Sequence, residues 1–296
     1  MKIRTICVSA ICLLLIFNLS DVAFAAESSL SVSISNGFEM EDANNALEML
    51  KESFSSKADL SDEQLLLVDE LVNCYKDDAM FSEHYSHDPE GAIDMVSGVV
   101  NSMLSMGNKP TVPQRASVYV ASGVPSHKQI QAYSCGAASA LQVIVQQGGA
   151  GNVSGSTYNA KEQTLINQTG LGAGTQTTVI VWEVAMLINN YTSAHSYAYI
   201  KCTSMSQSTF NNMVRDSLIK NCPVILHAIK KYMGYYPATD NGGHYIVGYA
   251  WIPASGTFTV NDCHYSNSYT GVHTVQMVAA YNSVHAVADR YLIYGY

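Results

Sequence analysis

The sequence lacks the features by which many function classes are recognised. Only 15 of its 296 residues are lysine or arginine, and they are scattered, which argues against nucleic-acid binding. The glycine-rich run at residues 170–175 is not followed by the lysine of a phosphate-binding loop. There is no internal repeat, no low-complexity tract and no closely spaced pair of metal ligands. These absences lead us to expect neither a cofactor nor a bound metal.

After its first 25 residues, the chain also lacks an apolar stretch long enough to cross a membrane, which takes about 20 residues. The first residues have the pattern of an export signal, because Lys2 and Arg4 precede an apolar run at residues 6–19. Ala23 and Ala25 offer small side chains where signal peptidase reads, so residues 1–25 are predicted to be a signal peptide. An uncleaved anchor is the alternative. The mature protein is expected to be secreted and extracellular, with no stable membrane span.

What the chain does have is a strong asymmetry of charge. Most of its 24 acidic residues lie at positions 26–109, where they are opposed only by Lys51, Lys57, Lys76 and Lys109. The remainder of the chain is mildly basic. Such asymmetry suggests either an acidic tail or an intramolecular partner.

The acidic region also carries helical patterns. Leu47, Leu50 and Phe54 have helical spacing, and residues 61–64 resemble a helix start with a capping box. We interpret residues 26–112 as a small acidic helical pro-region that lies against the basic part of the chain. An unrelated helical domain is the alternative.

A proline-bearing linker follows. Pro110 and Pro113 lie in a segment without helical or strand patterning, as is common at domain boundaries. The remaining residues, 113–296, have the size of one domain. Its patterns predict helices from residue 135, at 177–189 and at 208–220, and strands at 196–201, 223–229, 244–251, 256–261 and 290–294. Helices first and strands later indicate an α+β domain with an antiparallel sheet.

Cys135 is the candidate nucleophile. It opens a helical apolar pattern formed by Ala138, Leu141, Ile144 and Val145, and Ser134 before it is a suitable helix cap. A thiolate in the first turn of a helix is stabilised by the helix dipole, which lowers its pKa and favours covalent catalysis. The alternative is a small buried core residue.

His244 is the candidate base and Asp262 the group that orients it. The two lie on consecutive predicted strands joined by a turn at residues 253–256, and a hairpin of this kind places such residues side by side. A cysteine nucleophile needs a base, and the base needs an orienting group. A purely structural histidine–acid pair is the alternative.

Four segments together resemble the C39-type family of papain-like cysteine peptidases. They are Gln129, residues 135–138, residues 243–249 and residues 260–262. The resemblance implies a papain-like fold over about residues 116–296. It implies Cys135 as nucleophile, His244 as general base and acid, and Asp262 as orienter of the imidazole. The side chain of Gln129 and the backbone N–H of Cys135 would form the oxyanion hole. The chain departs from the family at Ala137 and Cys263, where the family usually has proline.

The resemblance implies an exported cysteine peptidase, made as a zymogen that is cleaved between residues 109 and 116. Its partners would be a peptide or protein substrate and its own pro-region. The alternatives are a cysteine amidase or transferase acting on cell-wall peptides and a non-catalytic exported binding protein.

Other candidate sites are weaker. His244, Asp262, Cys263 and His264 are of metal-ligand type but lack a ligand spacing. If Cys135 is free, a Cys202–Cys222 disulfide is our prediction, because an exported protein can form disulfides. The tyrosine-rich loop at residues 232–236 is expected either to contact substrate or to face solvent.

Overall fold

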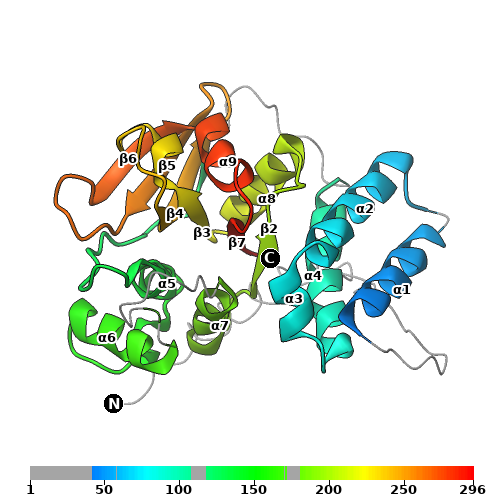
Figure 1. The fold of residues 1–296 in the computed structure, drawn as a ribbon, viewed down its shortest axis with the longest axis horizontal. Helices are drawn as coiled ribbons and strands as arrows, with labels where there is room; N and C mark the ends of the chain where they lie inside the picture. The colour runs from blue at the N-terminus through cyan, green and yellow to red at the C-terminus, as the bar shows by residue number, and fades with distance from the viewer. Residues whose placement is uncertain (1–41, 58, 108–117, 170, 172–180) are drawn as a thin grey trace, which may run out of the picture. The chain divides into compact units, whose positions relative to one another are not determined.

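The computed structural model describes residues 42–57, 59–107, 118–169, 171 and 181–296 (Figure 1). The described residues belong to one compact unit of the chain. The predicted signal peptide, the proline-bearing linker and most of the glycine-rich run lie outside the described residues. No helix within the described ranges is both long and apolar enough to span a membrane.

The acidic region forms four helices: α1 (Ala43–Ser55), α2 (Asp62–Lys76), α3 (Ala79–His84) and α4 (Pro89–Gly107). The predicted capping box at the start of α2 is present, because Ser61 and Gln64 each accept the other's backbone N–H. Leu47, Leu50 and Phe54 are fully buried, as their spacing predicts. These helices therefore have an apolar core of their own, despite their surface charge.

The rest of the chain has the predicted order of helices before most of the strands. The helices are α5 (Cys135–Gln146), α6 (Tyr158–Thr169), α7 (Val181–Tyr191), α8 (Gln207–Ile219) and α9 (Met277–His285), with 3-10 turns η1 (Gly149–Asn152) and η2 (Lys230–Met233). The strands are β1 (Tyr119–Val120), β2 (Tyr197–Lys201), β3 (Val224–Ile229), β4 (Gly243–Ile252), β5 (Thr257–Asp262), β6 (Gly271–Gln276) and β7 (Tyr291–Gly295). Helix α6, strand β6 and helix α9 are elements that the patterns did not predict.

The strands form one antiparallel sheet in the order β2-β7-β3-β4-β5-β6, and β1 pairs with β4. The fold is thus α+β, with a helical part and an antiparallel sheet. Helix α5 packs against the central strand β4 and against α7. This packing brings the start of α5 to the strand that carries His244.

The β4–β5 hairpin sets the register of the candidate site. Asp262 pairs with Ile246, two residues along the strand from His244, and alternate residues of a strand project from the same face. Gly248 lies at the centre of this hairpin, where an added Cβ would come within 2.1 Å of the Phe258 ring. Close packing of the two strands therefore requires glycine at this position.

Hydrogen bonds join α1–α4 to later elements. Glu70 of α2 accepts hydrogen bonds from the Ser206 backbone N–H and the Thr209 hydroxyl at the start of α8. Ser102 of α4 donates to Asp216 of α8 at 2.7 Å. These hydrogen bonds join α2 and α4 to α8, and the interpretation of residues 26–112 as a pro-region stays a prediction.

The contacts of α3 reach other elements. Tyr291 of β7 donates to Asp78 at 3.1 Å, and His84 stacks on Trp182 of α7. Among the described residues, the hydrogen bonds and ring contacts of α1–α4 do not involve Cys135, His244 or Asp262.

The predicted Cys202–Cys222 disulfide is wrong. All five described cysteines are free thiols. Cys202 precedes α8 and Cys222 follows it, and a 13-residue helix is about 20 Å long, so the two lie at opposite ends of that helix. The thiol of Cys222 lies against Gly295, whereas Cys202 interacts with Cys74.

Candidate active site

Cys135 begins α5, as predicted, and its side chain is partly exposed. Ser134 occupies the N-cap position, but its hydroxyl does not cap the helix. It accepts the backbone N–H of Gln131 and donates to the Gln131 carbonyl, both at 3.1 Å. Ser134 therefore closes the turn that precedes the nucleophile and leaves the first N–H groups of the helix without a side-chain cap.

Gly136 explains how the nucleophile comes so close to the sheet. A Cβ at this position would lie 3.3 Å from Val184 of α7 and 3.4 Å from the Tyr245 ring of β4. A larger residue would push α5 away from both neighbours. Glycine thus sets the distance between the Cys135 helix and the strand of His244.

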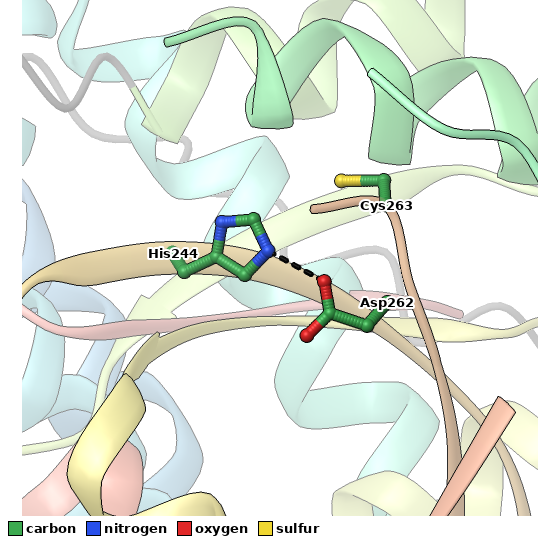
Figure 2. A group of neighbouring side chains, drawn as sticks. All are labelled: His244, Asp262 and Cys263. Carbon is green, nitrogen blue, oxygen red and sulfur yellow. Dashed lines mark hydrogen bonds and ion pairs between the residues drawn. The ribbon is translucent and has the colours of Figure 1, made fainter. Parts of the chain in front are cut away.

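His244 and Asp262 form a buried pair, as the hairpin predicts. The imidazole Nε2 lies 2.7 Å from the Asp262 Oδ1, and the two residues are 4 % and 0 % exposed (Figure 2). Because Nε2 is engaged by the carboxylate, the other ring nitrogen, Nδ1, is left for the thiol of Cys135. The arrangement is that of nucleophile, base and orienting acid.

Electrostatics favour a charged thiolate–imidazolium pair. Burial opposes the thiolate, but the charge of His244, its hydrogen bond and the N–H groups of Tyr245 and Gly136 outweigh burial and lower the pKa of Cys135. Burial also opposes the imidazolium, but Asp262 and Cys135 raise the pKa of His244 well above its usual value. Between these two pKa values both groups are charged, which is the reactive form of a cysteine nucleophile.

Asp262 accepts four hydrogen bonds. Oδ1 accepts from His244 and, at 2.8 Å, from the backbone N–H of His264, while Oδ2 accepts from the hydroxyls of Tyr235 and Tyr236 at 2.8 and 2.7 Å. Burial opposes the carboxylate, but His244 and the two tyrosines outweigh it, so the pKa of Asp262 is lowered. These two members of the tyrosine-rich loop hold the orienting acid, a role that sequence reasoning missed.

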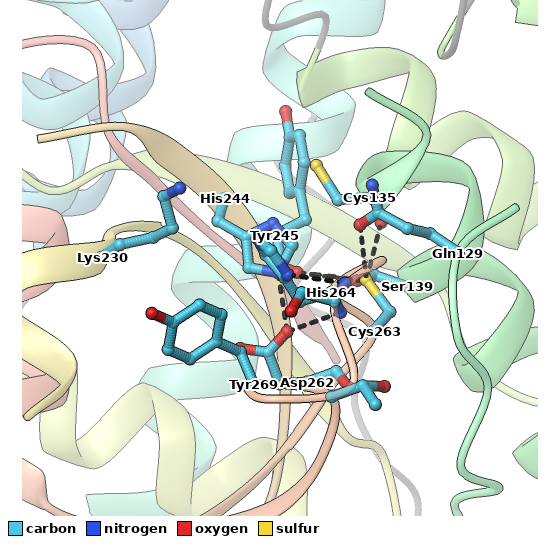
Figure 3. Close-up of polar contacts among 12 residues, drawn as sticks. Gln129, Cys135, Ser139, Lys230, His244, Tyr245, Asp262, Cys263, His264 and Tyr269 are labelled. Carbon is cyan, nitrogen blue, oxygen red and sulfur yellow. Dashed lines mark hydrogen bonds and ion pairs between the residues drawn. The ribbon is translucent and has the colours of Figure 1, made fainter. Parts of the chain in front are cut away.

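Gln129 lies beside Cys263, close to the nucleophile (Figure 3). Its backbone N–H donates to the Cys263 carbonyl at 2.7 Å, and its side-chain Nε2 donates to the Gln131 carbonyl at 2.6 Å. The Cys263 thiol lies 3.8 Å from the Gln129 Oε1 and 3.6 Å from the Cys135 carbonyl. The structure therefore brings Gln129, Cys135, His244 and Asp262 into one neighbourhood, with Cys263 between them.

The segment that carries Gln129 is anchored by a buried acid that the sequence did not indicate. Glu162 of α6 is 0 % exposed, lies 2.6 Å from the His127 Nε2 and accepts the backbone N–H of Ile130 at 3.1 Å. Gln142 of α5 donates to the His127 carbonyl at 3.1 Å. The only signal in the sequence was that Glu162 is one of the few acids outside the acidic region.

One group of described residues has the composition of a metal site. Ligand atoms of His244, Asp262 and Cys263 lie within 4.8 Å of one another. The oxygens of Asp262 are already occupied by four donors, and burial raises the pKa of the Cys263 thiol to about 11. A metal ion at this group would have to displace the hydrogen bond between Asp262 and His244, so the arrangement is that of an oriented imidazole.

Comparison with known proteins agrees with this geometry. No curated protein sequence matches the chain. The model described as the Peptidase_C39 like family matches residues 121–294, which is more than half of the chain and includes all four candidate site residues. The chain therefore belongs to the C39-like peptidase family.

Proposed function

We propose that the protein is a secreted cysteine peptidase that hydrolyses peptide bonds through an acyl-enzyme at Cys135. The observation that carries this proposal is the position of His244, whose Nε2 is held by Asp262 while its charge stabilises the Cys135 thiolate. A histidine–acid pair with a purely structural role does not require a partly exposed thiol beside it, whereas a catalytic pair does.

In the first step, the Cys135 thiolate attacks the carbonyl carbon of the scissile peptide bond, and the carbonyl oxygen becomes an oxyanion. The backbone N–H of Cys135 and the side-chain Nε2 of Gln129 are the candidate donors to that oxygen. Nε2 carries two hydrogens and gives one to the Gln131 carbonyl, so the other is available.

In the second step, the tetrahedral species collapses, the C–N bond breaks and the His244 imidazolium gives its proton to the leaving amine. A thioester to Cys135 remains. Water then loses a proton to neutral His244 and attacks the thioester, which releases the carboxylic acid product and restores the thiolate–imidazolium pair. Asp262 stays ionised throughout and holds the imidazole in place.

We further propose that the acidic helical region is made as part of the precursor. We also expected these helices to cover the active site. The described contacts of α1–α4 do not support this expectation, because they are made with α7, α8, β2 and β7. Activation by removal of residues 26–112 stays a prediction.

The test compares the wild type with Cys135→Ala. We expect the wild type to hydrolyse peptides or casein-like proteins and to yield a shortened secreted form by mass spectrometry, with both lost in the variant. Muropeptides are assayed in parallel to detect an amidase. An active Cys135→Ala protein would exclude the proposal, and an inactive wild type with an unreactive Cys135 would favour a binding protein.

A further inference from the structure

Arg290 lies beside the candidate active site and forms no ion pair with another described residue. It precedes β7, and its carbonyl accepts the Cys202 backbone N–H at 3.0 Å. The residue before it, Asp289, has a φ of 61°, a conformation that is uncommon for residues other than glycine. The surrounding structure must hold Asp289 in this conformation, and Asp289 sets the backbone direction from which the Arg290 side chain extends.

The guanidinium reaches the start of β4. A Cβ added to Gly243 would lie 3.1 Å from the Arg290 Nη2 and 3.0 Å from the His227 Nε2. Gly243 is exposed and directly precedes His244. Arg290 thus lies next to the strand residue that adjoins the candidate base, and a side chain at position 243 would collide with it.

The donors of Arg290 are largely unused. Nη1 donates to the Asp289 carbonyl at 2.9 Å, whereas Nε is buried and has no partner among the described residues. Arg290 forms no ion pair with a described acid. The Asp289 carboxylate acts on it at longer range and lies 3.4 Å from the Lys201 Nζ. Arg290 is half-buried, and its Nη2 lies beside the exposed Gly243, so this end of the guanidinium is placed to meet a ligand next to His244.

Tyr245 continues this group toward the nucleophile. It is 5 % exposed, its buried hydroxyl has no partner among the described residues, and it interacts electrostatically with both Cys135 and Arg290. His227 stacks on Tyr245 at 4.8 Å, and its buried Nδ1 likewise has no partner in the described part of the chain. Burial, followed by Arg290, keeps the pKa of His227 well below its usual value, so this imidazole is neutral and does not compete for an anion.

We propose that Arg290 binds the side-chain carboxylate of an aspartate or glutamate close to the scissile bond of a peptide substrate. This inference rests on the proposed peptidase function. A guanidinium presents parallel N–H donors that match the two oxygens of a carboxylate. Glu183 on α7 also acts electrostatically on Tyr245, and it makes no ion pair with Arg290.

The first experiment uses matched peptides with blocked ends that differ by glutamate or glutamine at each position near the scissile bond. We expect the wild type to prefer glutamate at one position by roughly 10-fold in kcat/KM, as hydrogen bonds to charged groups provide. Arg290→Gln is expected to reduce this ratio to near one and Arg290→Lys to retain part of it.

Arg215→Gln on α8 is the control and should keep the wild-type ratio. Equal losses on both peptides in Arg290→Gln, or no glutamate preference in the wild type, would overturn the proposal.

The second experiment does not require hydrolysis. Iodoacetate carries a carboxylate and iodoacetamide does not, so the ratio of their rates of alkylation at Cys135 reports a cation near the thiol. We expect Arg290→Gln to lower this ratio several-fold, with Arg215→Gln unchanged. An unchanged ratio in a folded Arg290→Gln protein would overturn the carboxylate site. A changed ratio in a protein that hydrolyses no peptide would retain the site and reject the proposed peptidase function.

Discussion

The carbonyl oxygen of Cys263 accepts the backbone N–H of Gln129 at 2.7 Å, which joins the residue after Asp262 to the candidate oxyanion donor. The Cys263 thiol lies 3.8 Å from the Gln129 Oε1 and 3.6 Å from the Tyr245 carbonyl. The sulfur contacts the oxygen end of the Gln129 amide, and its single hydrogen has two further acceptors in reach, the carbonyls of Cys135 and Tyr245. Proline, usual here in the family, has no side-chain donor, so this contact is a property of this chain.

We predict that Cys263 acts through the orientation of Gln129. Cys263→Val fills the space without a donor and should lower kcat roughly 10-fold with little change in KM, because a displaced oxyanion donor weakens only the transition state. Cys263→Ser retains a donor and should keep most of the activity. The measurements are kcat, KM and the rate of Cys135 alkylation by iodoacetamide, a reaction that needs the thiolate but no oxyanion hole. Equal losses of hydrolysis and alkylation would instead indicate a general disturbance of the site.

A second prediction concerns Tyr236, whose hydroxyl donates to the Asp262 Oδ2 at 2.7 Å. Tyr236→Phe leaves a buried carboxylate with one donor fewer, and we expect a loss of about 1–3 kcal/mol in the free energy of unfolding at pH 7. The lowered pKa of Asp262 means that its contribution is present above its unfolded pKa and is lost as pH falls through the folded value. The difference between wild type and variant should therefore shrink on acidification.

The control for this experiment is Tyr281→Phe, which removes a hydroxyl that donates to the neutral Met205 carbonyl at 2.9 Å. Urea unfolding from pH 7 to pH 3 measures both variants. A loss in Tyr236→Phe that stays constant with pH, like that expected for Tyr281→Phe, would show that the Asp262 charge is not what the tyrosine stabilises.

Thiol reactivity gives a third prediction. Among the described cysteines, Cys135 alone has a lowered pKa, whereas burial raises those of Cys74 and Cys263 to about 12 and about 11. Iodoacetamide at neutral pH should therefore label Cys135 in the folded protein and leave the other described cysteines unmodified. Mass spectrometry of the labelled peptides measures this selectivity.

The same pKa shifts set the pH dependence of activity. Hydrolysis should rise as pH passes through the lowered pKa of Cys135, where the thiolate forms. It should fall as pH passes the raised pKa of His244, where the imidazolium loses the proton that the leaving amine requires. His244→Gln should move Cys135 alkylation to higher pH, since it removes the charge that stabilises the thiolate. A variant that alkylates as the wild type does would contradict this pairing.

The sequence predicted the parts of the site that depend on local patterns. The hairpin that joins β4 to β5 was predicted, and Cys135 starts a helix whose apolar spacing was visible. The register that puts Asp262 on the same face as His244 also depends on a shift in strand pairing between Gly248 and Ala250, which the sequence did not indicate. The α+β class followed from the order of elements. These predictions needed no knowledge of contacts between distant segments.

The parts that could not be predicted depend on side chains meeting across distant elements. Tyr235 and Tyr236 reach Asp262 from a loop, and nothing in a loop pattern states where a hydroxyl points. Glu162 lies on α6, whose weak apolar periodicity hid the helix itself. The wrong Cys202–Cys222 disulfide came from closeness along the chain, although an intervening helix separates the two thiols.

A fifth prediction tests Glu162 as the anchor of the Gln129 segment. Glu162→Gln places an amide between the His127 imidazole and the Ile130 N–H, which weakens a buried pair and a backbone contact together. Weakening hydrogen bonds to a buried carboxylate costs about 1–3 kcal/mol, so we expect a loss of that order in the free energy of unfolding and a lower kcat.

Glu183→Gln is the matched control, because burial raises the pKa of Glu183 and one of its oxygens has no partner among the described residues. Losing that charge at pH 7 should leave stability unchanged or slightly higher, since a buried, unpaired carboxylate is destabilising. Urea unfolding and peptide hydrolysis measure both variants. If Glu162→Gln were as stable and as active as Glu183→Gln, Glu162 would not be the anchor. The Gln129 segment would then be held by its other contacts, of which the hydrogen bond to the Cys263 carbonyl is the main one.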